Sequence, residues 1–296
     1  MTTAFQPSPN LERTLIALLC LIWGSTWLVI KGGLRDLPPL TSAGVRFAVA
    51  AVVMIGVAAV LGRREGGDRP PTWLWMIQGT TSFAISYGIV YQAETVLSSG
   101  LVSLLFGLYP MLQAASGHLF LEGERLAPHQ WFGFILGLAG LALLFRTDLR
   151  SFGPEGIPTG ILALLSPIAV VIGTTIVKRH GSGASSVLLN RNGMFFGAAL
   201  LLACAVVFER NAEISWTAPA IASVLYLALV GTVVTFSLYF WLLRSCPAHR
   251  LALIAYVTPA IAIFLGWLFA GEPVTAFTLG GGACILSGVV LVVRRR

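Results

Sequence analysis

The sequence predicts an all-α integral membrane protein with ten transmembrane helices, arranged as two inverted five-helix repeats. Three observations support this fold class. Hydrophobic residues make up 56% of the chain and charged residues only 10%, whereas soluble domains carry about 25% charged residues. The charged residues divide the chain into uncharged runs near the ~20 residues that a helix needs to cross a bilayer. The two halves of the chain also carry matching motifs.

The expected spans follow the uncharged runs in order. Runs such as 15–21 and 141–145 are apolar on every side, unlike the alternating strands of a transmembrane barrel. The expected spans are residues 14–30, 40–61, 72–92, 95–120, 127–145, 156–177, 185–207, 218–243, 249–270 and 275–293. The fourth span is long enough to be tilted, kinked or partly interfacial.

Basic residues are distributed unequally between the two sides of this topology. Twelve lie on the side of the N-terminus, and five lie on the other side: Lys31, Arg35, Arg146, Arg150 and Arg210. Since loops rich in lysine and arginine stay in the cytoplasm, the bias predicts two cytoplasmic termini and an even number of spans. It also accounts for the net charge of +7 without a nucleic-acid partner.

The chain contains an internal repeat at half its length. Glu124 and Gly140 recur as Glu272 and Gly288, at a constant offset of 148 residues. Three further pairs correspond within a few residues: Lys31 with Lys178, Arg46 with Arg191, and Pro110 with Pro259. Because five is odd, the second half enters the membrane with the opposite orientation. We therefore expect two five-helix repeats, residues 1–150 and 151–296, that form a single transport unit. A duplication that only built a stable bundle is the alternative.

Several short motifs recur in an order typical of one transporter family. They are Trp23-Gly-Ser-Thr-Trp27 and residues 38–47, 98–110, 121–126 and 259–273. With these motifs the sequence resembles the EamA family of the drug/metabolite transporter superfamily, and the resemblance extends over nearly the whole chain. The resemblance implies a ten-helix exporter of amino acids or related metabolites. Within the family, the aromatic-rich helices look most like those of the aromatic amino-acid exporters of the YddG type.

A carrier of zwitterions needs polar groups for the charged ends and an apolar or aromatic surface for the side chain. The first span places three such residues on one helical face, because they are three or four positions apart. The predicted substrate contacts are Trp23, Thr26, Trp27, Tyr87, Tyr91, Gln92, Ser99, Ser103, Phe106, Tyr239 and Tyr256. Helix packing and interhelical hydrogen bonds are the alternative roles for these side chains.

Two arginines and two prolines at corresponding positions of the two halves lie inside the predicted spans. An unpaired charge there costs ~3 kcal/mol or more. Arg46 and Arg191 lie near opposite ends of corresponding helices, which suits gating or contact with a substrate carboxylate. Snorkelling to the lipid headgroups is the alternative. Pro110 and Pro259 each remove a backbone hydrogen bond and predict kinks, either as pivots or as static bends.

Acidic residues are scarce in the predicted spans. Glu124 and Glu272 follow the fourth and ninth spans, where the dipole of the next helix favours a carboxylate. Glu94 lies in the expected turn between the third and fourth spans. We expect its side chain to be solvated there, with proton coupling as the alternative. The near absence of buried carboxylates argues against a proton relay.

The sequence predicts a secondary transporter of the bacterial inner membrane that exports aromatic or bulky neutral amino acids by alternating access. Its expected partners are a small-molecule substrate and membrane lipids, and a sealed ten-helix bundle can work as a monomer. We expect no cofactor, metal or catalytic group, since the three aspartates lie in loops and the four histidines form no metal-binding pair. A nucleotide-sugar or sugar-phosphate carrier is the alternative, although phosphate would demand more cations. A channel and an intramembrane enzyme are more distant alternatives.

Overall fold

The computed structural model describes residues 9–65, 67–121, 126–146, 148–245 and 253–293. Within these ranges the chain forms helices and no strand, apart from one isolated bridge between Asp68 and Ala184. Seven described helical segments are long and apolar enough to cross a membrane, and two shorter apolar helices cover Val257–Ala270 and Ala276–Val292. The all-helical membrane class is thus confirmed, and the number of ten spans stays a prediction.

The helices of the first half follow the expected order. Their bounds are α1 (Pro9–Gly33), α2 (Pro39–Glu65), α3 (Thr72–Gln78), η1 (Gly79–Ile85), α4 (Ser86–Val96), α5 (Ser99–Phe106), α6 (Tyr109–Phe120) and α7 (Pro128–Arg146). The segments α3, η1 and α4 run without a break, so they form one long helix. The fourth expected span is instead divided between α5 and α6. Pro110 stands directly after this break, as the second residue of α6.

The helices of the second half follow a short connection. This connection consists of α8 (Asp148–Ser151) and the 3₁₀ turn η2 (Gly153–Glu155). The remaining bounds are α9 (Gly156–His180), α10 (Ser186–Phe208), α11 (Ala218–Leu225), η3 (Tyr226–Val234), α12 (Thr235–Ser245), α14 (Leu253–Ala270) and α15 (Ala276–Val293). Pro259 lies in the interior of α14.

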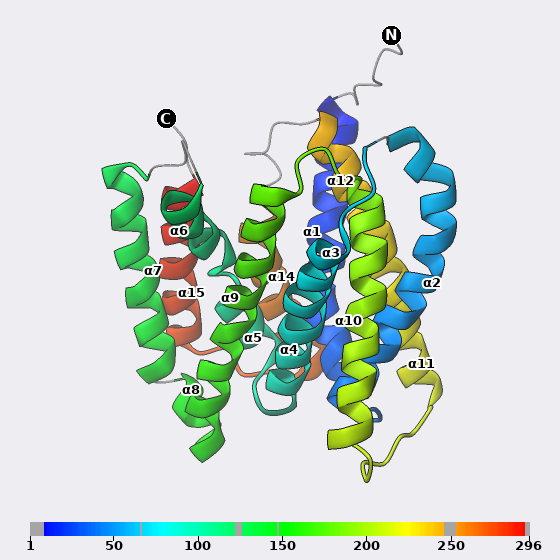
Figure 1. The fold of residues 1–296 in the computed structure, drawn as a ribbon. Coiled ribbons are helices and arrows are strands. Elements are labelled where there is room, and N and C mark those ends of the chain that lie inside the picture. The colour runs from blue at the N-terminus through cyan, green and yellow to red at the C-terminus, as the bar shows by residue number, and fades with distance from the viewer. Residues whose placement is uncertain (1–8, 66, 122–125, 147, 246–252, 294–296) are drawn as a thin grey trace.

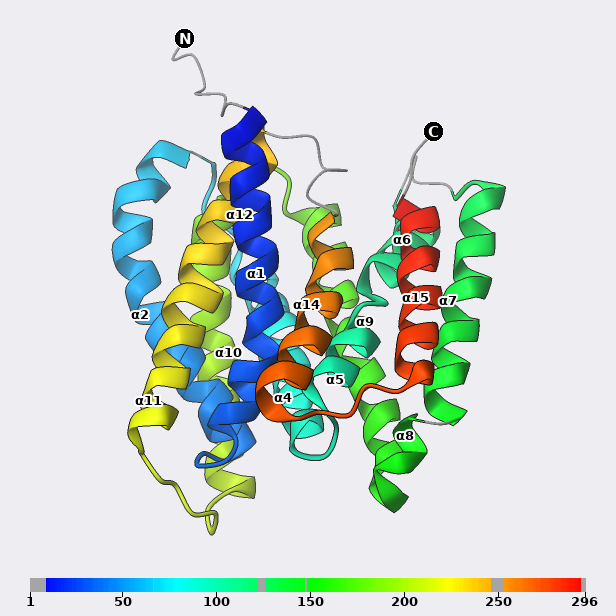
Figure 2. The same ribbon diagram turned by 180° about the vertical axis from the view of Figure 1, so that it is seen from behind.

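The helices run side by side as a bundle with two distinct ends. The start of α1 and the end of α15 lie at the same end (Figure 1), which we call the terminal face. The end of α4, the start of α9 and the start of α11 lie at the other end, which we call the opposite face. Seen from behind, α1 runs between α14 and the α11–α12 helix (Figure 2).

Two helices contain a π-helical segment, η1 in the third helical run and η3 in the run from α11 to α12. Such segments widen the helical turn, and they occur often at functional sites. In η3, the hydroxyl of Thr232 donates to the carbonyl oxygen of Leu227, five residues earlier, at 2.8 Å. The π-turn therefore holds Thr232 in a fixed orientation, with its oxygen lone pairs free to accept.

Large apolar side chains cover the outside of the bundle. Phe208, Val206 and Phe269 are 77%, 74% and 71% exposed. Monomeric soluble proteins rarely expose contiguous apolar surface on this scale. Further apolar residues fill the interior, where Phe47 and Leu104 are completely buried. Apolar surfaces inside and outside are what a helical bundle needs when lipid is its solvent.

Glycines bring α7 and α15 into close contact. A Cβ atom on Gly288 would lie 2.5 Å from the carbonyl oxygen of Gly133, and one on Gly140 would lie 2.5 Å from that of Gly281. Small residues let helix backbones approach closely in lipid, where packing replaces the hydrophobic effect as the driving force. Of the two repeated glycines, Gly140 on α7 thus faces α15, and Gly288 on α15 faces α7.

We expect Gly288→Ala to lower the thermal unfolding midpoint of the purified protein by several degrees. The added methyl group forces the two helices apart, and overpacking of this kind costs ~1–3 kcal/mol. Gly280→Ala is the matched control on the same helix, because its Cβ would meet Leu143 at an ordinary 3.6 Å. Equal midpoints for the two variants would contradict the close packing of α7 on α15.

Candidate functional site

The guanidinium group of Arg46 lies inside the bundle, between α2, α4 and η3. The residue is 1% exposed. Its Nε and Nη2 atoms lie 3.2 Å from the hydroxyl oxygen of Thr232, and Nη1 lies 3.3 Å from that of Tyr91. The ring of Tyr87 lies 4.9 Å from the guanidinium carbon, within cation–π range. This burial is incompatible with snorkelling to the headgroups.

Glu94 is also completely buried, although we expected it in a solvated turn. It lies in the last turn of α4, is 0% exposed, and neither carboxylate oxygen has a hydrogen-bond partner in the structure. The expectation was wrong because α4 extends to Val96, so that Glu94 belongs to the helix and faces its neighbours. A buried carboxylate without hydrogen bonds is costly, and such a group calls for an explanation.

Lys31 joins the end of α1 to the end of α4. Its ammonium group donates to the backbone carbonyl oxygen of Glu94 and, at 2.8 Å, to that of Leu97. These carbonyls lie at the C-terminus of α4, where the helix dipole favours a cation. Lys31 is thus hydrogen-bonded to backbone oxygens next to the Glu94 carboxylate.

Glu272 caps the N-terminus of α5. Its carboxylate accepts hydrogen bonds from the backbone N–H of Ser99 at 2.8 Å, from the Ser99 hydroxyl at 2.9 Å and from the backbone N–H of Gly100 at 3.2 Å. The expected structural role is therefore present, but the capped helix belongs to the first half and is not the helix that follows. Glu124, its counterpart in the repeat, lies outside the described residues.

Lys31, Arg46 and Glu272 each act electrostatically on Glu94. We call this group the charged cluster. It brings together α1, α2, α4 and the segment after α14, near the opposite face. It contains two cations and two carboxylates. The carboxylate of Glu272 accepts three hydrogen bonds, and that of Glu94 accepts none from the described residues.

Aromatic side chains from both halves lie along α1. The ring of Trp23 lies 5.6 Å from that of Tyr239 and 6.0 Å from that of Phe236, both on α12. One turn further along α1, the ring of Trp27 lies 5.7 Å from that of Phe106 on α5. These separations fall in the range of favourable aromatic contacts. Trp23 thus contacts aromatic rings of α12, and Trp27 contacts one of α5.

The other predicted site residues have varied surroundings. Thr26 is buried and donates to the carbonyl oxygen of Trp23, and Ser103 is buried and donates to that of Gly100. Gln92 is exposed on α4. Arg191 is partly buried and donates to the side chain of Asn192. The side chain of Tyr256 lies outside the described part of the chain.

Sequence reasoning missed Thr232 and Phe236, and it expected Glu94 in a solvated turn. Thr232 and Phe236 carried no signal, because nothing in the sequence marks a π-turn or its neighbours. The buried position of Glu94 did have a signal: between Arg69 and Glu122, it is the single residue of the types Asp, Glu, Lys and Arg. An isolated charge in so long an apolar region is itself a mark of function.

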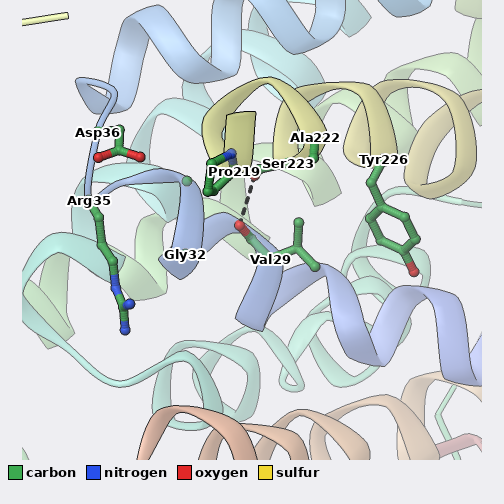
Figure 3. A pocket seen from close by; sticks show the side chains of 9 residues that line it. Val29, Gly32, Arg35, Asp36, Pro219, Ala222, Ser223 and Tyr226 are labelled. Carbon is green, nitrogen blue, oxygen red and sulfur yellow. Dashed lines mark hydrogen bonds between the residues drawn. The ribbon is translucent and has the colours of Figure 1, made fainter. Parts of the chain in front are cut away.

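Two open cavities lie near the surface of the bundle. One of about 530 Å³ lies between the end of α1 and the α11–η3 helix (Figure 3). Val29 and Tyr226 both line it, and Ser223 donates to the carbonyl oxygen of Val29. The other, of about 500 Å³, is lined by apolar residues of α5, α14 and α15. Neither is lined by the predicted substrate contacts whose side chains are described. Within this set, Trp23 contacts Tyr239 and Trp27 contacts Phe106 in this conformation.

Known sequences identify the family. The sequence model of the EamA-like transporter family matches residues 12–146 and again residues 158–294. The chain is 30% identical over 282 residues to the uncharacterized inner membrane transporter YedA of Escherichia coli K12, covering 93% of this chain and 88% of YedA. It is 29% identical over 280 residues to the uncharacterized transporter YvbV of Bacillus subtilis, covering 94% and 90% of the two chains.

A solved crystal structure has the same fold. It is 20% identical in sequence, covers 96% of this chain and 98% of its own, and superposes with a TM-score of 0.67. The family matches and the relatives confirm the resemblance seen in the sequence motifs. The chain is a membrane transporter that belongs to the EamA-like transporter family of the drug/metabolite transporter superfamily.

Proposed function

We propose that the protein exports aromatic or bulky neutral amino acids by alternating access, as in exporters of the YddG type. The observation that carries this proposal is the state of Arg46. It is a buried cation whose hydrogen bonds in the structure go to two neutral hydroxyl groups. Its charge is not used in a hydrogen-bonded ion pair, so it can receive a substrate carboxylate in a charge-assisted hydrogen bond.

The surroundings of Arg46 supply the other features that such a substrate needs. Trp23 and Trp27 on α1, with their aromatic partners on α5 and α12, offer a surface for a large apolar side chain. A phosphorylated substrate would need several cations together. The remaining candidates for that role are Arg191 and Lys178. Arg191 is partly buried beside Asn192, and Lys178 is exposed at the end of α9. The balance of charge favours a zwitterion.

The proposal includes two inverted five-helix halves that work as one unit. The double match of the family model supports it, because each match covers one half. The contacts of corresponding helices support it too. Arg46 of α2 binds Thr232 of η3, while Asn190 of α10 accepts from Gln78 at the end of α3, directly before η1, at 3.0 Å. An inverted repeat supplies two conformations of similar energy, open to opposite faces.

The proposal also covers location and assembly. The protein lies in the bacterial inner membrane with both termini in the cytoplasm, and it acts as a monomer on a small-molecule substrate. The description of its relative YedA as an inner membrane transporter supports the location. The excess of arginine and lysine that the sequence predicts on the side of the N-terminus supports the orientation.

Counterflow of labelled tryptophan in proteoliposomes tests the function. We expect saturable exchange that phenylalanine competes with, and we expect Trp27→Ala to raise the half-saturation concentration about tenfold, since an aromatic contact contributes up to ~1.5 kcal/mol. Trp216→Ala removes a tryptophan that is 49% exposed before α11, so it serves as the matched control. Absence of exchange for any amino acid, with the protein folded, would refute the substrate class.

A further inference from the structure

The unpartnered carboxylate of Glu94 calls for a neutralising partner. The group is fully buried, and Lys31 and Arg46 make their hydrogen bonds elsewhere, to backbone carbonyls and to hydroxyls. A bare carboxylate in such a site is unstable unless it gains hydrogen bonds or takes up a proton. No group of the described structure supplies those hydrogen bonds, and a proton or the cationic end of a ligand would neutralise the carboxylate.

We propose that Glu94 is a shared site for a proton and for the ammonium group of the substrate, so that export is coupled to proton entry. This inference rests on the proposed function. In the conformation seen here the carboxyl holds a proton. When the terminal face opens, the O–H bond breaks, the proton passes to water, and the carboxylate accepts hydrogen bonds from the ammonium group. When the opposite face opens, the substrate leaves and a proton from that side takes its place.

A single carboxylate sets a ratio of one proton exchanged for one substrate molecule. One carboxylate can be neutralised by a proton or by an ammonium group, but not by both. Arg46 is bonded to Tyr91, one turn before Glu94 on α4, and it acts electrostatically on Glu94, so we assign to it the carboxylate of the same amino acid. An α-amino acid carries both charges on one carbon atom, so its two ends suit two neighbouring groups of opposite sign.

The groups that face Glu94 come from each helix packed around it. Lys31 on α1, Arg46 on α2 and Glu272 after α14 act on it electrostatically, and Tyr87 and Tyr91 lie on its own helix. α9 meets α4 through the hydroxyl pair of Ser86 and Ser166, at 2.8 Å, and its basic residues lie in its last turn at the far end. Glu272 keeps its capping hydrogen bonds, which leaves Glu94 as the carboxyl that exchanges the proton.

The first test measures tryptophan transport into proteoliposomes as a function of pH. For the wild type we expect the half-saturation concentration to rise about tenfold per pH unit on the acid side of the Glu94 titration, as protons displace the substrate. We expect a one-unit pH gradient to drive up to about tenfold accumulation. Glu94→Gln should still exchange tryptophan, with a pH-independent half-saturation concentration and no accumulation. Glu94→Asp should retain the response to the gradient at a lower rate.

The controls separate this inference from the function on which it rests. Glu213→Gln, an exposed carboxylate in the loop after α10, should behave as the wild type. Indole-3-propionate lacks the ammonium group, so it should inhibit the wild type and Glu94→Gln equally. A Glu94→Gln variant that accumulates tryptophan as the wild type does would overturn the inference alone. Absence of tryptophan exchange in the wild type would overturn the proposed function.

Infrared difference spectroscopy tests the proton without any substrate. We expect the wild type at neutral pH to show the carbonyl stretch of a protonated carboxyl group, and we expect Glu94→Gln to lack it. Glu213→Gln should keep the band. A neutral-pH spectrum with no protonated carboxyl band from Glu94 would overturn the inference, whatever the transport assays show.

Discussion

Replacing Arg46 with alanine is expected to lower tryptophan exchange about a hundredfold. The change removes the buried cation together with its hydrogen bonds to Tyr91 and Thr232. Hydrogen bonds to charged groups contribute ~1.5–3 kcal/mol each, and a loss of ~3 kcal/mol corresponds to two orders of magnitude. The charged cluster would also lose one of its two cations. Counterflow in proteoliposomes measures the effect.

Two further variants separate charge from folding. Arg46→Lys keeps the charge but loses the planar fork that reaches both hydroxyls, so we expect an intermediate rate. Arg191→Ala removes the corresponding arginine of the second half, which is partly buried and bonded to its neighbour Asn192. Its effect should be much smaller. If Arg46→Ala is folded, by gel filtration and circular dichroism, and exchanges tryptophan at the wild-type rate, Arg46 does not bind the substrate.

The sequence was sufficient to predict which segments are helical, because lipid imposes a strong and local requirement. Each span must satisfy its own backbone hydrogen bonds and present apolar side chains, so its length and composition are visible in the chain. The helices of the structure overlap the expected spans, including the short ones at the C-terminal end. The break before Pro110 was signalled as well, since proline cannot continue the hydrogen-bond pattern of the preceding turn.

The partners of the polar residues could not be predicted from the sequence. Glu272 caps α5, more than 170 positions away, and Arg46 binds Thr232, 186 positions away. Such pairs depend on how helices pack, and a helical pattern does not encode its neighbours. The position of Glu94 was mistaken for a different reason. The turn between two spans was expected a few residues too early, and near a helix end such a shift decides between burial and solvation.

A disulfide between α5 and α14 is expected to stop transport almost completely. These helices come from the two halves and pack together near the opposite face. A Cβ atom on Gly100 would lie 3.5 Å from the Cβ of Ile263, and disulfides join Cβ atoms about 3.5–4.5 Å apart. Gly100→Cys with Ile263→Cys, in a variant lacking the four native cysteines, therefore permits a covalent bond in the present conformation. Alternating access requires the halves to separate at this face.

Tryptophan counterflow of this double variant before and after oxidation tests the central claim most directly. We expect exchange in the reduced protein, a loss of more than about tenfold when the disulfide has formed, and recovery on reduction with dithiothreitol. Each single-cysteine variant should be insensitive to the oxidant. Exchange that continues unchanged, in protein shown by gel mobility to be fully cross-linked, would contradict transport by movement of one half against the other.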